Sequence, residues 1–251
     1  MNDTISVGTL LISSSLIVIS LAFSYYQRLK LEKELLISAV RAVVQLVLAG
    51  YLLNYIFGLN HPLFTTMLLL FMIFNAAYNA AKRAGSVKKA LWVSFLAIIV
   101  GTASTLAILV ISRALKYEPS KIIPVSGMII SNSMVAIGLC YRQMNLDFKN
   151  RRDEVEVRLA LGADILPSSI EIIHSAIKTG MMPTIDSAKT LGIVSLPGMM
   201  TGLILAGVSP IEAIKYQIMV VFMLLSTTAI SSSIACFLYY KKFFNTRNQL
   251  L

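Results

Sequence analysis

The stretch ALWVSFLAIIVGTASTLAILVIS, residues Ala90–Ser112, decides the fold class of this chain. It holds 23 residues and contains no Asp, Glu, Lys or Arg. An α-helix needs about 20 apolar residues to cross the roughly 30 Å of hydrocarbon in a lipid bilayer. Six further stretches are also long and largely apolar, namely Ile5–Tyr26, Leu35–Phe57, Leu63–Ala81, Ile123–Cys140, Ile185–Gly207 and Ile211–Tyr240. The sequence therefore predicts an all-α, polytopic integral membrane protein with about seven transmembrane helices.

The composition of the whole chain agrees with this class. Of its 251 residues, 57% are hydrophobic and only 14% are charged, whereas soluble domains carry roughly 25% charged residues. An ordinary soluble enzyme and a disordered chain are both excluded. Both cysteines, Cys140 and Cys236, lie in apolar runs and predict no disulfide framework.

The basic residues predict how the chain is oriented in the membrane. Its formal net charge of +10 would suggest nucleic acid in a soluble protein, but here 16 of the 22 Lys and Arg residues fall on one side of the predicted spans. Only Arg113, Lys116, Lys121 and Lys215 fall on the other side. Because positive loops stay in the cytoplasm, we expect an inner-membrane protein with its N-terminus outside, its C-terminus inside and no nucleic-acid partner.

The residues 1–251 read as a single transmembrane domain with one long cytoplasmic segment, at about 141–184. Its first half predicts a short amphipathic helix over 153–164, with an apolar stripe that includes Val155 and Leu159. Its second half predicts a helix after Pro167, starting at a Ser168–Glu171 capping box and ending at Gly180.

The sequence EVRLALGA in the first of these helices carries a pattern of its own. Glu154 and Arg158 form a pair at i, i+4, and Glu156 stands six residues before Gly162. A short helix with an apolar stripe, a fixing charge and a glycine turn is the form of a coupling helix, which docks into a cleft of a separate ATPase. An ordinary helix lying in the membrane interface is the alternative.

The sequence SLPGMMTG in the sixth predicted span indicates a gate. Pro197 is expected to kink the helix, and Gly198 and Gly202 form a GxxxG face that lets another helix approach closely. Static packing of small residues is the alternative.

Polar side chains inside the spans are candidates for a translocation pathway, because a polar group in lipid must find a partner or face a water-filled cavity. These candidates are Ser131, Asn132 and Ser133 in the fifth span, the i, i+4 pair Arg41 and Gln45 in the second, and Gln217 in the seventh. Met199 and Met200 could offer thioethers to a soft metal, although methionine in an apolar helix is commonly packing. Interhelical hydrogen bonding is the alternative for the polar group, and no metal ligand set can be assigned.

The chain lacks the motifs of an enzyme or of an ATPase. It contains no GxxxxGK[ST] and no HExxH, and no pair of acids falls within a predicted span. We therefore expect no catalytic residue and no cofactor bound by this chain.

Several of these stretches together resemble a known family. RAVVQLVLAGYLL (41–53), GMIISNSMVAIGL (127–139), EVRLALGA (156–163) and the LPGMMTG block (196–202), in this order, resemble the FetB-type ABC permeases, which are bacterial iron exporters similar to plant membrane proteins of aluminium tolerance. The resemblance implies a permease that pairs with a separately encoded ATP-binding subunit, which uses the ATP, and a role in iron homeostasis and oxidative-stress resistance. One small permease with one coupling segment further implies two permease copies and two ATPases. A secondary transporter, an ABC exporter of a non-metal solute such as a nucleotide sugar, and a structural scaffold are the alternatives.

Overall fold

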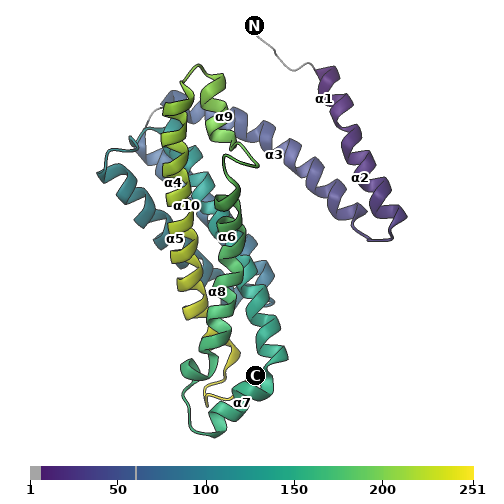
Figure 1. Ribbon diagram of the computed structural model, residues 1–251, viewed down its shortest axis with the longest axis vertical. Coiled ribbons are helices and arrows are strands. Elements are labelled where there is room, and N and C mark those ends of the chain that lie inside the picture. The colour runs from purple at the N-terminus through teal and green to yellow at the C-terminus, as the bar shows by residue number, and fades with distance from the viewer. Residues whose placement is uncertain (1–6, 60) are drawn as a thin grey trace. The chain divides into compact units, whose positions relative to one another are not determined.

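The computed structural model describes residues 7–59 and 61–251, and the regular secondary structure in these ranges is helical (Figure 1). The chain divides into two compact units, residues 1–60 and 61–251. Residues 5 and 6, at the start of the first predicted span, lie outside the described residues.

The first unit is a helical hairpin. Helices α1 (Val7–Ser13) and α2 (Ser15–Tyr26) precede a tight turn, and α3 (Glu32–Leu59) follows it. In the turn Arg28 and Lys30 have positive φ angles of 54° and 58°, and the Ser24 hydroxyl donates a hydrogen bond of 2.8 Å to the Glu32 carboxylate. These contacts fix the reversal of the chain between α2 and α3.

The second unit is a bundle built around one long helix, α6 (Pro119–Asn150). Helices α4 (Pro62–Ala81), α5 (Val87–Ile111), α8 (Ile165–Thr190) and α10 (Pro210–Tyr239) all contact α6. Single 3₁₀ turns follow α4 (Lys82–Ala84) and α10 (Tyr240–Phe243). The helices approach closely because small side chains line their contacts. Ala77, Ala90, Ala97, Ala176 and Ala235 are fully buried in the core.

Polar side chains also join the bundle helices. Thr105 on α5 and Thr227 on α10 share a hydrogen bond of 2.7 Å, and both hydroxyls also reach the Gly101 carbonyl oxygen. In the core the Tyr141 hydroxyl lies 3.0 Å from that of Ser94. Hydroxyls buried in an apolar bundle are stabilising only when they find such partners.

Within residues 7–59 and 61–251, five helices are long and apolar enough to cross a membrane, namely α3, α4, α5, α6 and α10. They confirm the spans predicted over 35–57, 63–81, 90–112, 123–140 and 211–240, although α6 continues ten residues beyond Cys140. The total of seven spans stays a prediction.

The sixth span, predicted as one helix over 185–207, is wrong as a continuous element. Helix α8 ends at Thr190, a non-helical segment covers residues 191–197, and the short α9 (Gly198–Leu205) follows. We call residues 191–197 the helix break. Gly192 adopts φ +79° there, and Pro197 has no N–H and disfavours helix at the residue before it. Pro197 therefore caps a new helix and does not kink an existing one.

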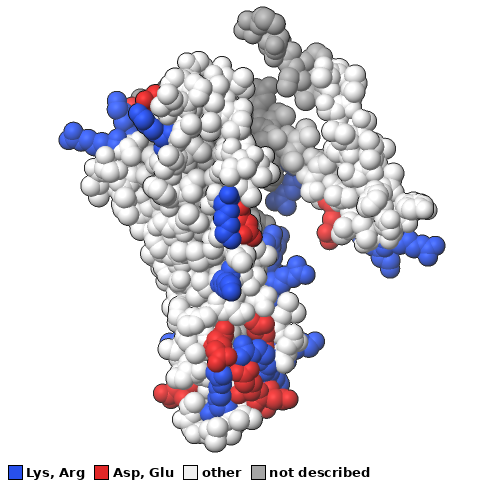
Figure 2. Space-filling view, viewed as in Figure 1, with Lys and Arg blue, Asp and Glu red and all other residues white. Residues whose placement is uncertain are grey.

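Charged side chains gather at one end of the second unit. Figure 2 shows them over α7 (Arg152–Ala160) and the start of α8. The rest of the unit is covered mainly by uncharged residues but carries a few charged side chains, among them the exposed pair of Asp186 and Lys189 on α8. A smaller charged group, which includes Arg113, Glu118 and Lys121, lies around the turn between α5 and α6. A largely uncharged body between two charged ends is the surface expected of a protein that crosses a bilayer.

Candidate functional site

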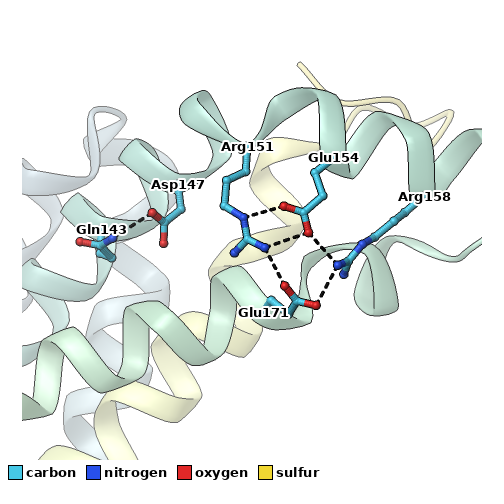
Figure 3. Close-up of polar contacts among 6 residues, drawn as sticks. All are labelled: Gln143, Asp147, Arg151, Glu154, Arg158 and Glu171. Carbon is cyan, nitrogen blue, oxygen red and sulfur yellow. Dashed lines mark hydrogen bonds and ion pairs between the residues drawn. The ribbon is translucent and has the colours of Figure 1, made fainter.

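Helix α7 confirms the short helix predicted over 153–164 and is held against α8 by four charged side chains. Arg151 donates to both carboxylate oxygens of Glu154 at 2.7 and 2.8 Å and to Glu171 at 2.6 Å. Arg158 donates to Glu154 and to Glu171, at 2.7 Å each. Figure 3 shows that the four side chains form a closed ring between α7 and α8. We call Arg151, Glu154, Arg158 and Glu171 the ion-pair cluster.

The cluster keeps its carboxylates charged. Hydrogen bonds from Arg151 hold the pKa of Glu154 below its ordinary value, and hydrogen bonds from Arg158, then from Arg151, lower the pKa of Glu171. The same bonds raise the pKa of Arg151. Exposed pairs are individually weak because solvent screens them. A closed network of two bases and two acids nevertheless fixes the orientation of α7 on α8.

The apolar side chains of α7 do not point in the direction that the sequence predicted. The expected apolar stripe for a partner's cleft is turned inward, because Val155 is 1% exposed and Leu159 packs against the core of the same chain. The exposed apolar side chains are instead Val157 and Leu161, at 58% and 83%. A partner that docks on α7 therefore meets these two residues.

The other predicted coupling residues lie at the outer edge of α7. Glu156 accepts a hydrogen bond of 2.8 Å from Arg152, and Arg152 also donates to the main-chain oxygen of Leu251. Gly162 has φ +89°, which confirms the sharp glycine turn expected after the helix. The second helix begins at Ile165 and continues through Gly180, so its predicted capping box and C-cap are both wrong.

Helix α8 runs without interruption from the ion-pair cluster to a cavity of about 390 Å³. The cavity is lined by α6, α8, the helix break, α9 and α10, and we call it the break cavity. Its polar lining is Asn132, Thr184, Ser187 and Gln217, and its apolar lining includes Met128, Pro183, Pro197 and Met199. No charged residue lines it.

The break cavity brings together five of the predicted pathway and gating residues, namely Asn132, Pro197, Gly198, Met199 and Gln217. Four others, Gly202 among them, lie elsewhere in the second unit. Ser131 is exposed, Ser133 is buried with no hydrogen-bond partner in the described part of the chain, and Met200 is half-buried outside the lining. Arg41 and Gln45 lie on α3 in the first unit, with exposed side chains.

The glycines of the GxxxG face meet no neighbour within the described chain. A Cβ added at Gly198 or Gly202 would have no heavy atom within 4 Å. The close helix contact expected there is not made inside one copy, and contact with another chain stays a prediction.

Three site residues were missed by the sequence reasoning. Glu171 was assigned to a helix cap, although a carboxylate near the bases of a coupling segment was a signal for an ion pair. Thr184 and Ser187 lie one turn apart on α8 next to Pro183, so the spacing P-T-x-x-S on one helical face could have indicated a polar lining.

The side chains do not form a metal centre. Among residues 7–59 and 61–251, no three His, Cys, Asp or Glu side chains are placed to hold a metal ion together. The break cavity instead offers amide and hydroxyl groups with two thioethers nearby.

A bundle of long apolar helices with a largely uncharged body between charged ends defines a multi-pass membrane protein. A family model described as "Uncharacterised protein family (UPF0014)" matches residues 7–244, and the chain belongs to this family. It is 46% identical to the "Probable iron export permease protein FetB" of Escherichia coli (strain K12), over 97% of this chain and 94% of that protein.

Two further relatives extend the comparison. The chain is 37% identical to the "UPF0014 membrane protein YjkA" of Bacillus subtilis (strain 168), over 93% of this chain and 94% of that one. It is 36% identical to the "Protein ALUMINUM SENSITIVE 3" of Arabidopsis thaliana, over 95% and 88%. No solved structure matches the chain.

Proposed function

We propose that this protein is the membrane-spanning permease subunit of an ABC transporter that exports iron or another metal ion, driven by a separate ATP-binding subunit. The printed name of the Escherichia coli relative supports iron export. One observation carries the coupling to ATP: α7 presents Val157 and Leu161 outward while the ion-pair cluster holds it on α8. Such a helix has the form needed to pass a partner's movement into the membrane.

The proposed mechanism uses α8 as a lever. A helix of 26 residues is about 39 Å long. Glu171 lies near its first end, and Thr184 and Ser187 line the break cavity near its last. ATP hydrolysis in the partner would move α7, the ion-pair cluster would pass the movement to α8, and the helix break would allow α8 to move against α9. The hinge is therefore placed at residues 191–197, and not at a kink between Pro197 and Gly198.

The assembly and orientation belong to the same proposal. The basic residues support the N-terminus outside and the C-terminus, with α7, in the cytoplasm of a cell with an inner membrane. One permease chain offers one α7, so two copies with two ATP-binding subunits would complete the transporter. The chain itself carries no nucleotide-binding motif and would bind no ATP.

Transport by reconstituted protein tests the proposal. The permease and its ATP-binding subunit, co-purified and placed in liposomes, are expected to move iron when ATP is added. Glu171→Gln removes one charge of the ion-pair cluster and should lower ATP-driven transport about 2- to 30-fold, the range of typical coupling energies. Glu212→Gln is the matched control, because Glu212 forms an exposed i, i+3 pair with Lys215 far from the cluster.

Two results would contradict the proposal. Iron movement at the same rate with a hydrolysis-dead ATPase would indicate a secondary transporter. ATP-driven movement of a nucleotide sugar without any movement of iron would indicate a non-metal exporter, which the uncharged lining of the break cavity keeps open as a second candidate.

A further inference from the structure

The turn between α4 and α5 gathers basic residues without any acid. It carries Lys82, Arg83, Lys88 and Lys89, and we call these four residues the basic turn. Among the described residues none of the four forms an ion pair. The sequence holds no Asp or Glu between residues 34 and 118, so the two helices that the turn joins cannot neutralise its charge.

Arg83 lies directly against α6, at a position where that helix has no side chain. A Cβ added at Gly138 would lie 2.7 Å from Cδ of Arg83 and 3.0 Å from its Nη1. The Arg83 guanidinium has no hydrogen-bond or ion-pair partner in the part of the chain that the structure describes. A guanidinium that is held in place but unpaired loses little freedom when it binds a ligand.

Arg142 on α6 brings a second guanidinium to the same region. The turn approaches α6 at Gly138 and again at Asn145, since a Cβ added at Gly85 would lie 3.9 Å from the Asn145 Nδ2. Arg142 lies between these two positions on one helical face, because residues three and four apart are neighbours on a helix. Its side chain is exposed and forms no ion pair within residues 7–59 and 61–251.

The acid of α6 does not compensate these two arginines. Asp147 is the only acid in the sequence of that helix, and it lies five residues beyond Arg142, which is about 140° around the helix. It accepts a hydrogen bond of 2.9 Å from Gln143 (Figure 3). A guanidinium binds phosphate through two parallel hydrogen bonds, so two unpaired guanidinium groups side by side are typical of a phosphate site.

Exposed aromatic side chains place the basic turn at the level of the lipid head groups. Tyr78, which is 43% exposed, lies one helical turn before Lys82, whose Nζ is 4.6 Å from the centre of its ring. Trp92, which is 74% exposed, lies one helical turn after Lys88. Tyr and Trp are enriched where a membrane meets water, so the bases just beyond these rings lie among the head groups.

We propose that the basic turn and Arg142 bind the head group of an anionic phospholipid, with its phosphate held between the guanidinium groups of Arg83 and Arg142. Basic groups between membrane helices on the cytoplasmic side bind such head groups. The aromatic rings beside the bases favour a lipid over a soluble phosphate, because a lipid also has acyl chains that lie against them. The turn packs on the end of α6 that leads into α7, so its place in the cytoplasmic leaflet rests on the orientation given in the proposed function.

Native mass spectrometry of the whole chain in detergent tests the inference. The probes are phosphatidylglycerol, phosphatidylcholine and inorganic phosphate, and we expect phosphatidylglycerol to bind at least about fivefold more tightly than either of the others. Arg83→Gln and Arg142→Gln should each weaken phosphatidylglycerol binding about fivefold, the typical effect of one base near an anionic lipid. Arg113→Gln is the matched control, because it removes an exposed arginine at the other end of α5 and should leave the affinity unchanged.

Gly138→Ala separates a built site from a general attraction of positive charge. It changes no charge, and the three atoms nearest to the new Cβ all belong to Arg83. The guanidinium must therefore shift, and phosphatidylglycerol affinity should fall about as much as in Arg83→Gln. The thermal midpoint of each variant, measured in the same detergent, shows that the fold is intact.

Four results would overturn the inference. They are equal binding of phosphatidylglycerol and phosphatidylcholine, an equal loss of affinity in Arg113→Gln, an unchanged affinity in Gly138→Ala, and inorganic phosphate bound as tightly as the lipid. A surface that binds protein would also overturn it, and Arg83→Gln would then weaken binding of the ATP-binding subunit and not of the lipid.

Failure of the lipid site is distinguishable from failure of the proposed function, because the binding assay contains neither ATP nor metal. ATP-driven iron transport by a protein without the lipid preference would refute the lipid site and leave the exporter. Preferential binding of phosphatidylglycerol at Arg83 and Arg142 in a protein that moves no iron would do the reverse.

Discussion

Gly180 is the residue on which the packing of α8 against α6 depends, and Gly180→Ala is the sharpest test of that packing. A Cβ at this position would clash with the Cys140 sulfur and would lie 2.7 Å from the Ala136 carbonyl oxygen. Both atoms belong to α6, and the carbonyl oxygen cannot move unless the helix backbone shifts. Real Cβ atoms essentially never approach so closely, so α8 must move away from α6.

The size of the effect follows from two opposing terms. Overpacking a core costs about 1–3 kcal/mol, and replacing glycine by alanine within a helix returns about 1 kcal/mol. The net loss is about 0–2 kcal/mol, and about 1 kcal/mol at the middle of that range. For a chain of this size, 1 kcal/mol corresponds to about 2–4 °C, so the thermal midpoint should fall by about 2–4 °C.

Thermal unfolding of the purified protein in detergent measures this change. Gly202→Ala is the control, and its midpoint should stay constant or rise. Adding Cys140→Ala to Gly180→Ala removes the sulfur and leaves the carbonyl contact, so the pair should be less destabilised than the sum of the two single variants. A Gly180→Ala protein as stable as the parent would refute the close approach of α6 and α8, and with it the lever.

Three further outcomes are expected. Because their pKa values are lowered, Glu154 and Glu171 stabilise α7 above their ordinary pKa of 4.5, and this stability is lost only as the pH falls through the lowered values. A spin label on α7 should therefore stay immobile down to pH 4.5 and loosen only below it, whereas loosening near pH 6 would contradict the cluster. Replacing both Val157 and Leu161 by Ser should weaken binding of the ATP-binding subunit about tenfold with an unchanged thermal midpoint; unchanged affinity would place the docking surface elsewhere. Val194 is 78% exposed in the helix break, and such backbone within a bilayer must be covered by protein or water. Val194→Cys is therefore expected to cross-link two permease copies on oxidation, and a protein that stays monomeric on a denaturing gel would count against the dimer.

The long helices could be predicted well from the sequence, because each one is marked by a continuous run of apolar residues. An apolar run such as Ala90–Ser112 can satisfy its backbone in a membrane only as a helix, and α5 occupies it. The i, i+4 pair of Glu154 and Arg158 is also local, and its salt bridge of 2.7 Å confirms it.

The errors arise where a distant contact decides the role of a residue. Gly180 carries the signal of a helix end, but it lies inside α8 because α6 leaves no room for a side chain. Glu171 has the spacing of a capping box, but its partner Arg151 lies 20 residues away. Neither contact can be read from a window of one or two helical turns, and the convergence of Asn132 and Gln217 on one cavity cannot be read that way either.

The helix break allows α8 to move relative to α9, which a single continuous membrane-spanning helix would not allow. If α8 continued unbroken to residue 207, a push on α7 would displace Thr184, Ser187 and the first turn of α9 together, and the break cavity would keep its shape. With residues 191–197 non-helical, α8 can move while α9 stays joined to α10 by a short turn. The polar lining on α8 then separates from the part of the lining that α9 contributes. A solute that contacts both sides of the cavity loses affinity at that moment, which is the step that ATP hydrolysis must drive in the proposed exporter.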